Sequence, residues 1–294
     1  MDDLKTNFKE KIEKELVAKK PTLSKGSIKT YMSNLYNIHK KMDSSEYTID
    51  WFSNNDDKII DYIKKLDVSK QSLKTYLSGL YILTGIKSYR DLMLIYCQDV
   101  NNNYKTQKMN QKQSDTRISF QDVENIYNEQ LYNVLKNPTS ENYIKYLACA
   151  LSSGVFFPPR RSEISNIKIK NYDKDTDNYL IKNKIYFNAY KTVKKYGQQI
   201  LVIPKNILTI LKKYLKTNST DYLFPIKNGE RSFSNGEYTR LLNSIFGKQI
   251  SVDALRSIYL SEKYKDMPKL DELQNTANEM GHTISTAIQC YVKK

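Results

Sequence analysis

Four side chains in this sequence of 294 residues have the types and the order needed to hold a phosphodiester and attack it. They are Arg160, Arg256, His282 and Tyr291. Arginine forks bind the non-bridging oxygens of a phosphate in a bidentate manner, and a histidine can donate a further hydrogen bond to a phosphate oxygen. A tyrosine oxygen can form a covalent phosphoenzyme that keeps the bond energy for religation. Such a set predicts phosphoryl transfer that needs neither a metal nor a cofactor.

The charge of the chain favours a polyanionic partner. Its formal net charge is +15 at pH 7, which is typical of proteins that bind nucleic acid. Only seven of its 47 basic residues are arginines, and two of those seven are Arg160 and Arg256. The placement of the arginines is therefore more informative than the abundance of lysine.

The cysteines and the hydropathy indicate the compartment. Cys97, Cys149 and Cys290 are odd in number, far apart and without metal-ligand spacing, which is typical of free thiols in a reducing environment. The N-terminal residues contain no apolar secretory segment, and the sequence has no run of about 18 apolar residues. We expect a soluble intracellular protein that does not associate with membranes.

The first 105 residues have the hydrophobic period of helices and contain few glycines or prolines. Residues 27–36 recur as residues 72–81, each time with an apolar stripe at helical spacing and a serine that can cap the start. We interpret them as paired helices of a small bundle. The polar residues beside the stripes either are surface positions of plain core helices or contact DNA phosphates. They are Lys29, Thr30, Lys74 and Thr75.

Residues 106–117 are polar and without a period, which predicts a flexible linker. Helical patterns resume after Ser119, a good N-cap. Two runs rich in β-forming residues, 179–187 and 199–203, are bracketed by turn residues. The expected fold is mainly α, with an N-terminal helical domain over 1–105. A mixed α+β domain with a small antiparallel sheet would follow over 118–294.

The boxes around the four side chains resemble those of the tyrosine recombinases of the phage-integrase family. Arg160 and Glu163 form an Arg-x-x-Glu box, Arg256 ends Asp-Ala-Leu-Arg, and His282 precedes Tyr291 by nine residues. The Pro-Pro-Arg-Arg form of the first box is similar to versions encoded by large eukaryotic DNA viruses and their mobile elements. The resemblance covers about residues 115–291 with specific motifs and residues 1–105 only in general character.

The resemblance implies a role for each residue. Arg160, Arg256 and His282 would hold the scissile phosphate, with Glu163 in support, and Tyr291 would attack it to form a 3′-phosphotyrosine. The family places its general acid, a lysine that protonates the departing 5′ oxygen, in a β-hairpin ahead of a strand. Lys191 fits this position best, and the competitors are Lys194 and Lys195.

One position departs from the family pattern. The family usually has histidine or lysine three residues before the second arginine, and this chain has Asp253. A carboxylate repels a phosphate unless it is protonated or paired with a cation. With Ser251 as N-cap, however, Asp253 would lie in the first turn of a helix, where the dipole stabilises a negative charge. We favour this structural role over a role as general base.

By resemblance, the expected function is site-specific DNA recombination, by which a mobile or viral genome is integrated, excised or resolved. The implied core-binding domain (1–105) and catalytic domain (118–294) would enclose double-stranded DNA, and the protein would self-associate into a dimer or tetramer on it. One alternative is an enzyme like the type IB topoisomerases, with the same chemistry but religation within one duplex. Another, motivated by Asp253, is a DNA-binding protein with an impaired active site.

Overall fold

The computed structural model describes residues 2–42, 48–160, 162–281, 283–286 and 288–289. This part of the chain is mainly helical and contains one three-stranded antiparallel sheet in the order β1-β2-β3, so the expected fold class is confirmed. The chain divides into two compact units. The helical unit comprises Met1–Lys108 and Pro268–Lys294, and the mixed unit comprises Met109–Met267. The functional division at 105 and 118 stays a prediction.

The helical unit buries one apolar core. Its helices are α1 (Asp2–Lys19), α2 (Lys25–Met42), α3 (Trp51–Asn54), α4 (Asp56–Lys64), α5 (Lys70–Thr84), α6 (Lys87–Lys105), α14 (Leu270–Glu279) and α15 (Ile284–Thr286). Leu35 of α2 and Leu77 of α5 are fully buried in this core, and both belong to the repeated segments. A Cβ atom on Gly79 of α5 would come within 3.2 Å of Tyr31 on α2. The two repeats therefore form helices that pack closely against each other, as expected.

A serine caps each repeat, but it precedes the repeated segment. The hydroxyl of Ser24 accepts a hydrogen bond from the Ser27 amide at 3.1 Å. In the same way Ser69 accepts from the Ser72 amide at 3.2 Å. Each capping serine lies three residues before the repeat and each helix starts two residues before it, because the serine satisfies a free amide of the first turn.

Residues 106–117 are partly helical, contrary to the expectation of a linker without regular structure, and most of them belong to the mixed unit. Helix α7 (Gln111–Thr116) begins with a capping box, in which Asn110 accepts from the Gln113 amide at 2.8 Å and Gln113 accepts from the Asn110 amide at 2.9 Å. These reciprocal bonds support a short helix where the hydrophobic period is missing.

The mixed unit surrounds a small sheet with helices. They are α8 (Phe120–Lys136), α9 (Ser140–Ser152), α10 (Val193–Tyr196), α11 (Lys205–Thr217), α12 (Asn235–Phe246) and α13 (Val252–Lys263), with a 3₁₀ helix at Ser162–Ile164. The strands are β1 (Tyr179–Ile181), β2 (Lys184–Phe187) and β3 (Gln199–Val202). Ser119 caps α8 as expected, because its hydroxyl accepts from the Asp122 amide at 3.0 Å.

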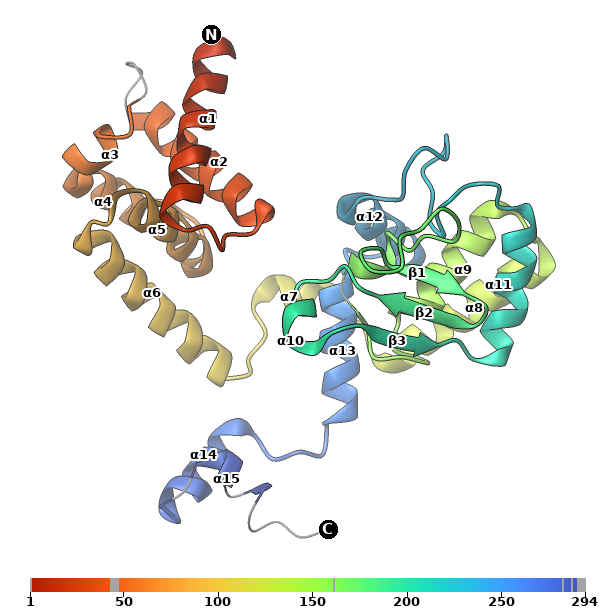
Figure 1. Cartoon of the computed structure of the whole chain (residues 1–294). Helices are drawn as coiled ribbons and strands as arrows, with labels where there is room; N and C mark the ends of the chain where they lie inside the picture. Colours follow the sequence, from red (N-terminus) through yellow and green to blue (C-terminus); the bar gives the residue numbers. More distant parts are fainter. Residues whose placement is uncertain (1, 43–47, 161, 282, 287, 290–294) are drawn as a thin grey trace. The chain divides into compact units, whose positions relative to one another are not determined.

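The sheet packs one face into the core of the mixed unit. On β2, Ile185 and Phe187 are fully buried in the same cluster as Leu147 of α9 and Leu211 of α11. Figure 1 shows the sheet beside α8, α9 and α11. In the antiparallel register Phe187 lies opposite Gln199 of β3. This pair ends the β2–β3 ladder, from which the connection 188–198 extends.

Candidate active site

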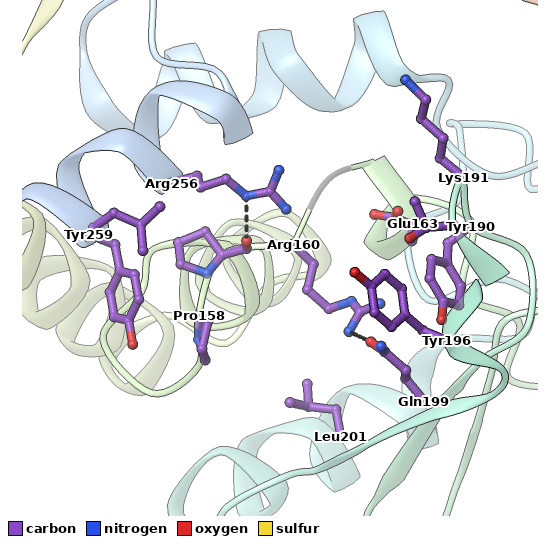
Figure 2. A pocket seen from close by; sticks show the side chains of 13 residues that line it. Pro158, Arg160, Glu163, Tyr190, Lys191, Tyr196, Gln199, Leu201, Arg256 and Tyr259 are labelled. Carbon is purple, nitrogen blue, oxygen red and sulfur yellow. Dashed lines mark hydrogen bonds between the residues drawn. The ribbon is translucent and has the colours of Figure 1, made fainter. Parts of the chain in front are cut away.

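A cavity of about 570 Å³ in the mixed unit brings together side chains from distant parts of the sequence. Arg160 and Glu163 line it from the loop and 3₁₀ helix after α9, Lys191 from the β2–β3 connection, and Arg256 from α13 (Figure 2). Four of the residues singled out in the sequence thus share one site. Among the described lining residues there are three cationic side chains and a single carboxylate, which makes the cavity suited to an anion.

The end of the sheet holds the Arg160 side chain. The guanidinium carbon lies 4.2 Å from the centroid of the Phe187 ring and 5.4 Å from that of Tyr190. Nη1 of Arg160 donates a hydrogen bond to Oε1 of Gln199, which Figure 2 marks with a dashed line. Burial lowers the pKa of the Arg160 guanidinium, the nearby charge of Glu163 opposes this, and Arg256 lowers the pKa further. Arginine stays charged in proteins, so the site contains a fixed and partly desolvated cation.

Two buried polar atoms, one in this guanidinium and one in the neighbouring carboxylate, lack hydrogen-bond partners among the described residues. They are Nε of Arg160 and Oε2 of Glu163. Buried polar atoms are nearly always paired in folded proteins, and an unpaired one requires an explanation. The Arg160 and Glu163 side chains are therefore incompletely paired at this site.

Arg256 is tied to the segment that carries Arg160. Its Nε donates to the carbonyl oxygen of Pro159 at 3.3 Å, a bond drawn in Figure 2. This bond uses one donor of the guanidinium, and the terminal nitrogens remain for other partners. The two arginines, far apart in sequence, are therefore held together through a backbone atom next to Arg160.

Asp253 has the position expected for a structural role. It lies in the first turn of α13, where Ser251 is the N-cap and accepts from the Ala254 amide at 3.2 Å. Its side chain is 71% exposed, and Oδ1 is 3.7 Å from Nη1 of Arg256. It borders a separate pocket of about 270 Å³ rather than the cavity that contains Arg160. Its carboxylate offsets part of the Arg256 charge from outside the site.

Replacing Asp253 by histidine should leave DNA cleavage equal or faster at pH 7. The change removes a negative charge near an anionic transition state and adds a group that titrates near neutrality. The lost helix-dipole interaction is worth about 0.3–1 kcal/mol, and the exposed ion pair about 0–1 kcal/mol. Single-turnover cleavage and thermal unfolding measure the two effects, and Asp253→Asn separates charge removal from the added imidazole. A large drop in cleavage at unchanged stability would give Asp253 a catalytic role of its own.

Lys191 lies at the rim of the cavity on the β2–β3 connection. Two hydrogen bonds pin the base of this connection, from Tyr190 Oη to the Gly197 carbonyl at 2.6 Å and from Gln198 Nε2 to Asn188 Oδ1 at 2.8 Å. Figure 2 shows the Lys191 side chain pointing away from Arg160. The competitors Lys194 and Lys195 lie in α10 and do not line the cavity. Of the three candidate lysines, Lys191 is the one at the site.

The segment that contains His282 and Tyr291 is only partly described. A glycine directly after an apolar helical stripe predicts the end of a helix, and Gly281 has this position. Helix α14 ends before Gly281, which has a φ of 69°, so this prediction is confirmed. His282 and Tyr291 lie outside the described residues. Their roles stay predictions.

The predicted DNA contacts of the helical unit lie on α2 and α5. Lys29 and Thr30 are exposed, whereas Lys74 and Thr75 are half-buried. The Thr30 hydroxyl donates to the Gly26 carbonyl at 2.9 Å, and that of Thr75 to the Gln71 carbonyl at 2.8 Å. Each threonine must rotate before it can donate to a phosphate. The contacts themselves stay predictions.

Several residues that form or support the site were not foreseen from the sequence. Phe187, Tyr190 and Gln199 hold Arg160, and Tyr259 lines the cavity one helical turn beyond Arg256. Nothing in the local pattern around Gln199 marks it as a partner of an arginine 39 positions away. A usable signal existed for Tyr259, because positions i and i+3 lie on one face of a helix.

The described ranges also bear on metal binding and on membrane insertion. There, no group of three or more histidine, cysteine, aspartate or glutamate side chains is placed to hold a metal ion. No helix in that same part of the chain has both the length and the apolar character needed to cross a membrane.

Comparison with known proteins shows weak similarity in fold only. No protein-family model matches the chain, and no curated protein does. Similar solved structures include the crystal structure of XerA recombinase, with a TM-score of 0.33 and 13% identity over 98% of this chain and 94% of that chain. Another is the Tn1549 transposon integrase in complex with circular intermediate DNA, with a TM-score of 0.45 and 12% identity over 97% of this chain and 94% of that chain. At these TM-scores the similarity supports no conclusion about activity, and function must be inferred from the side chains.

Proposed function

We propose that this protein is a site-specific DNA recombinase that cleaves and rejoins DNA through a 3′-phosphotyrosine. One observation carries the proposal: Arg160, Lys191 and Arg256, from three separate segments, line one cavity. Paired guanidinium groups match the geometry of a phosphodiester better than point charges do. The substrate would be the DNA of a mobile element or virus, and the working form a dimer or tetramer on that DNA.

In the proposed reaction the Tyr291 oxygen bonds to phosphorus while the bond from phosphorus to the 5′ oxygen breaks. The negative charge on the non-bridging oxygens grows in the transition state, so Arg160 and Arg256 stabilise it more than the ground state. His282 donates to one of these oxygens, and Glu163 supports the Arg160 charge. The 5′-hydroxyl of a partner strand then attacks the phosphotyrosine, which restores a phosphodiester and frees the tyrosine.

Lys191 is assigned as the general acid that protonates the departing 5′ oxygen. Its long and flexible side chain can turn from the rim toward the bound phosphate. General acids of this kind contribute typically about 10²–10⁴-fold to rate.

Trapping on nicked duplexes tests the proposal. A pool of duplexes with randomised sequence carries a nick beside each potential cleavage point, so the short released strand diffuses away and the covalent adduct accumulates. We expect a protein–DNA adduct in denaturing gels, with the DNA attached to the peptide that contains Tyr291. Recovery of joined DNA from two different duplexes would indicate recombination, whereas relaxation of supercoiled plasmid without such joining would indicate the topoisomerase alternative.

A second candidate function rests on Asp253, whose carboxylate lies 3.7 Å from Arg256. If this charge weakens the hold on phosphate, the chain would bind DNA without cutting it. DNA binding with no adduct anywhere in the pool would favour this function and contradict the first.

Lys191→Ala should slow cleavage by about 10²-fold or more, because the 5′ oxygen then leaves without a proton. A substrate with sulfur in place of that 5′ oxygen should restore the rate, since a thiol has a pKa near 8.5 and its thiolate leaves unprotonated. Single-turnover cleavage of both substrates is the measurement, and Lys194→Ala is the matched control. Equal losses in the two lysine variants would contradict the assignment.

A further inference from the structure

Asn178 is a buried side chain at the junction of the segments that form the cavity. It directly precedes β1 and is only 1% exposed. Its Oδ1 accepts from the Asn188 amide at 2.9 Å and from the Ala189 amide at 2.8 Å. Its Nδ2 donates to the Ala189 carbonyl at 3.0 Å, to Asn166 Oδ1 at 2.9 Å and to the Glu163 carbonyl at 3.3 Å. Both the donors and the acceptor of this carboxamide are therefore in use.

The partners of Asn178 belong to the two segments that present the cations. Glu163 is in the 3₁₀ helix that follows Arg160, and Ala189 is two residues before Lys191. Three of the five bonds, all between 2.8 and 3.0 Å, go to the backbone of the β2–β3 connection. The other two bonds go to the arginine segment, at 2.9 Å to Asn166 Oδ1 and at 3.3 Å to the Glu163 carbonyl. Asn178 therefore bridges the two segments, with three bonds to the lysine segment and two to the arginine segment.

We propose that Asn178 is a positioning residue that acts through Lys191. It fixes the β2–β3 connection against the segment of Arg160 and so keeps the general acid at the cavity without touching DNA. This inference rests on the proposed function and goes beyond it, because it makes the position of the proton donor depend on a side chain outside the cavity. Small displacements of a reacting group can cost about 10²-fold in rate.

Asn218 offers a matched control in the same unit. It is 8% exposed, its Oδ1 accepts from the Thr220 amide at 3.0 Å, and its Nδ2 donates to the Tyr222 carbonyl at 2.9 Å. It does not line the cavity. Asn178→Asp and Asn218→Asp each replace a donating NH₂ group by an oxygen, so they impose the same chemical change at two buried sites.

The experiment measures single-turnover cleavage per folded molecule, at saturating protein, on a duplex selected from the pool. Asn178→Asp should cleave at least tenfold more slowly, with DNA affinity within about twofold of the wild type. The substrate with a 5′ sulfur should remove most of this loss, because it does not need the general acid. Asn218→Asp should cleave both substrates at the wild-type rate. Asn178→Ser, which keeps one donor and one acceptor, should be intermediate.

Each other outcome overturns the inference. If the wild type cleaves and Asn178→Asp cleaves equally fast, the proposed function stands and the positioning role is wrong. A slow Asn178→Asp variant that the sulfur substrate does not rescue would mean that the asparagine does not act through Lys191. Failure of both Asn178 variants to fold would assign the residue to folding alone. A wild type that forms no adduct would remove the proposed function and this inference together.

Discussion

Replacement of Tyr291 by phenylalanine is expected to abolish covalent attachment to DNA. The change removes only the phenolic oxygen, which is the proposed nucleophile, and no other group in the chain is proposed to take its place. DNA affinity should remain within about twofold of the wild type, because the arginines and lysines that are proposed to contact phosphate are untouched. Adduct formation on nicked duplexes and equilibrium DNA binding measure the two properties separately.

Two other tyrosines are suitable for comparison in this test. Tyr264, at the end of α13, is 53% exposed and does not line the cavity, so Tyr264→Phe should form adduct normally. Tyr259 does line the cavity. Attachment that survives in Tyr291→Phe would contradict the assignment of the nucleophile, and Tyr259→Phe would then be the first variant to examine.

Arg160→Lys and Arg256→Lys should each slow cleavage by about 10²–10³-fold, the usual cost of losing one donor to a developing oxyanion. At position 160 an ammonium group cannot lie flat on the Phe187 ring and bond to Gln199 and phosphate together. At position 256 an ammonium group cannot bond to the Pro159 carbonyl and also donate two parallel hydrogen bonds to a phosphate. Single-turnover cleavage at saturating protein is the appropriate measurement, since it isolates the chemical step from binding.

Arg240→Lys provides the control for this pair. Arg240 is an exposed residue of α12 that does not line the cavity, and its replacement should leave cleavage within about twofold. Near-full activity in both Arg160→Lys and Arg256→Lys would reduce these arginines to ordinary phosphate contacts and remove the basis of the proposed site.

Features that depend on local sequence were predicted well. The two β-rich runs located the sheet and placed Lys191 ahead of its last strand, because strand and turn preferences act over a few residues. The first run, 179–187, forms two strands rather than one, since a turn at 182–183 divides it. Ser119 and Ser251 were recognised as caps, since a capping side chain bonds to an amide two or three positions away. The helix-ending Gly281 was recognised for a similar reason.

Features that depend on tertiary packing were not predictable in this way. Asn178 looks like one more turn residue in 173–178, yet its carboxamide bonds to segments on both sides of it, up to 15 positions away. The aromatic contacts of Arg160 come from Phe187 and Tyr190, which lie beside it only once the sheet has packed. Helix α7 was missed because its support is a capping box rather than an apolar stripe.

The bond from Arg256 to the carbonyl of Pro159 also sets the earliest point in the synthesis of a chain at which the two guanidinium groups can meet. The two residues are 97 positions apart. At a synthesis rate of about 5–20 residues per second, Arg160 waits roughly 5–20 s on the ribosome for its partner. During that time the cavity has only one of its two guanidinium groups, as does any fragment that breaks off before α13. Under the proposed function, a fragment that ends before α13 lacks both Arg256 and the proposed nucleophile Tyr291, so we expect it to leave DNA uncut.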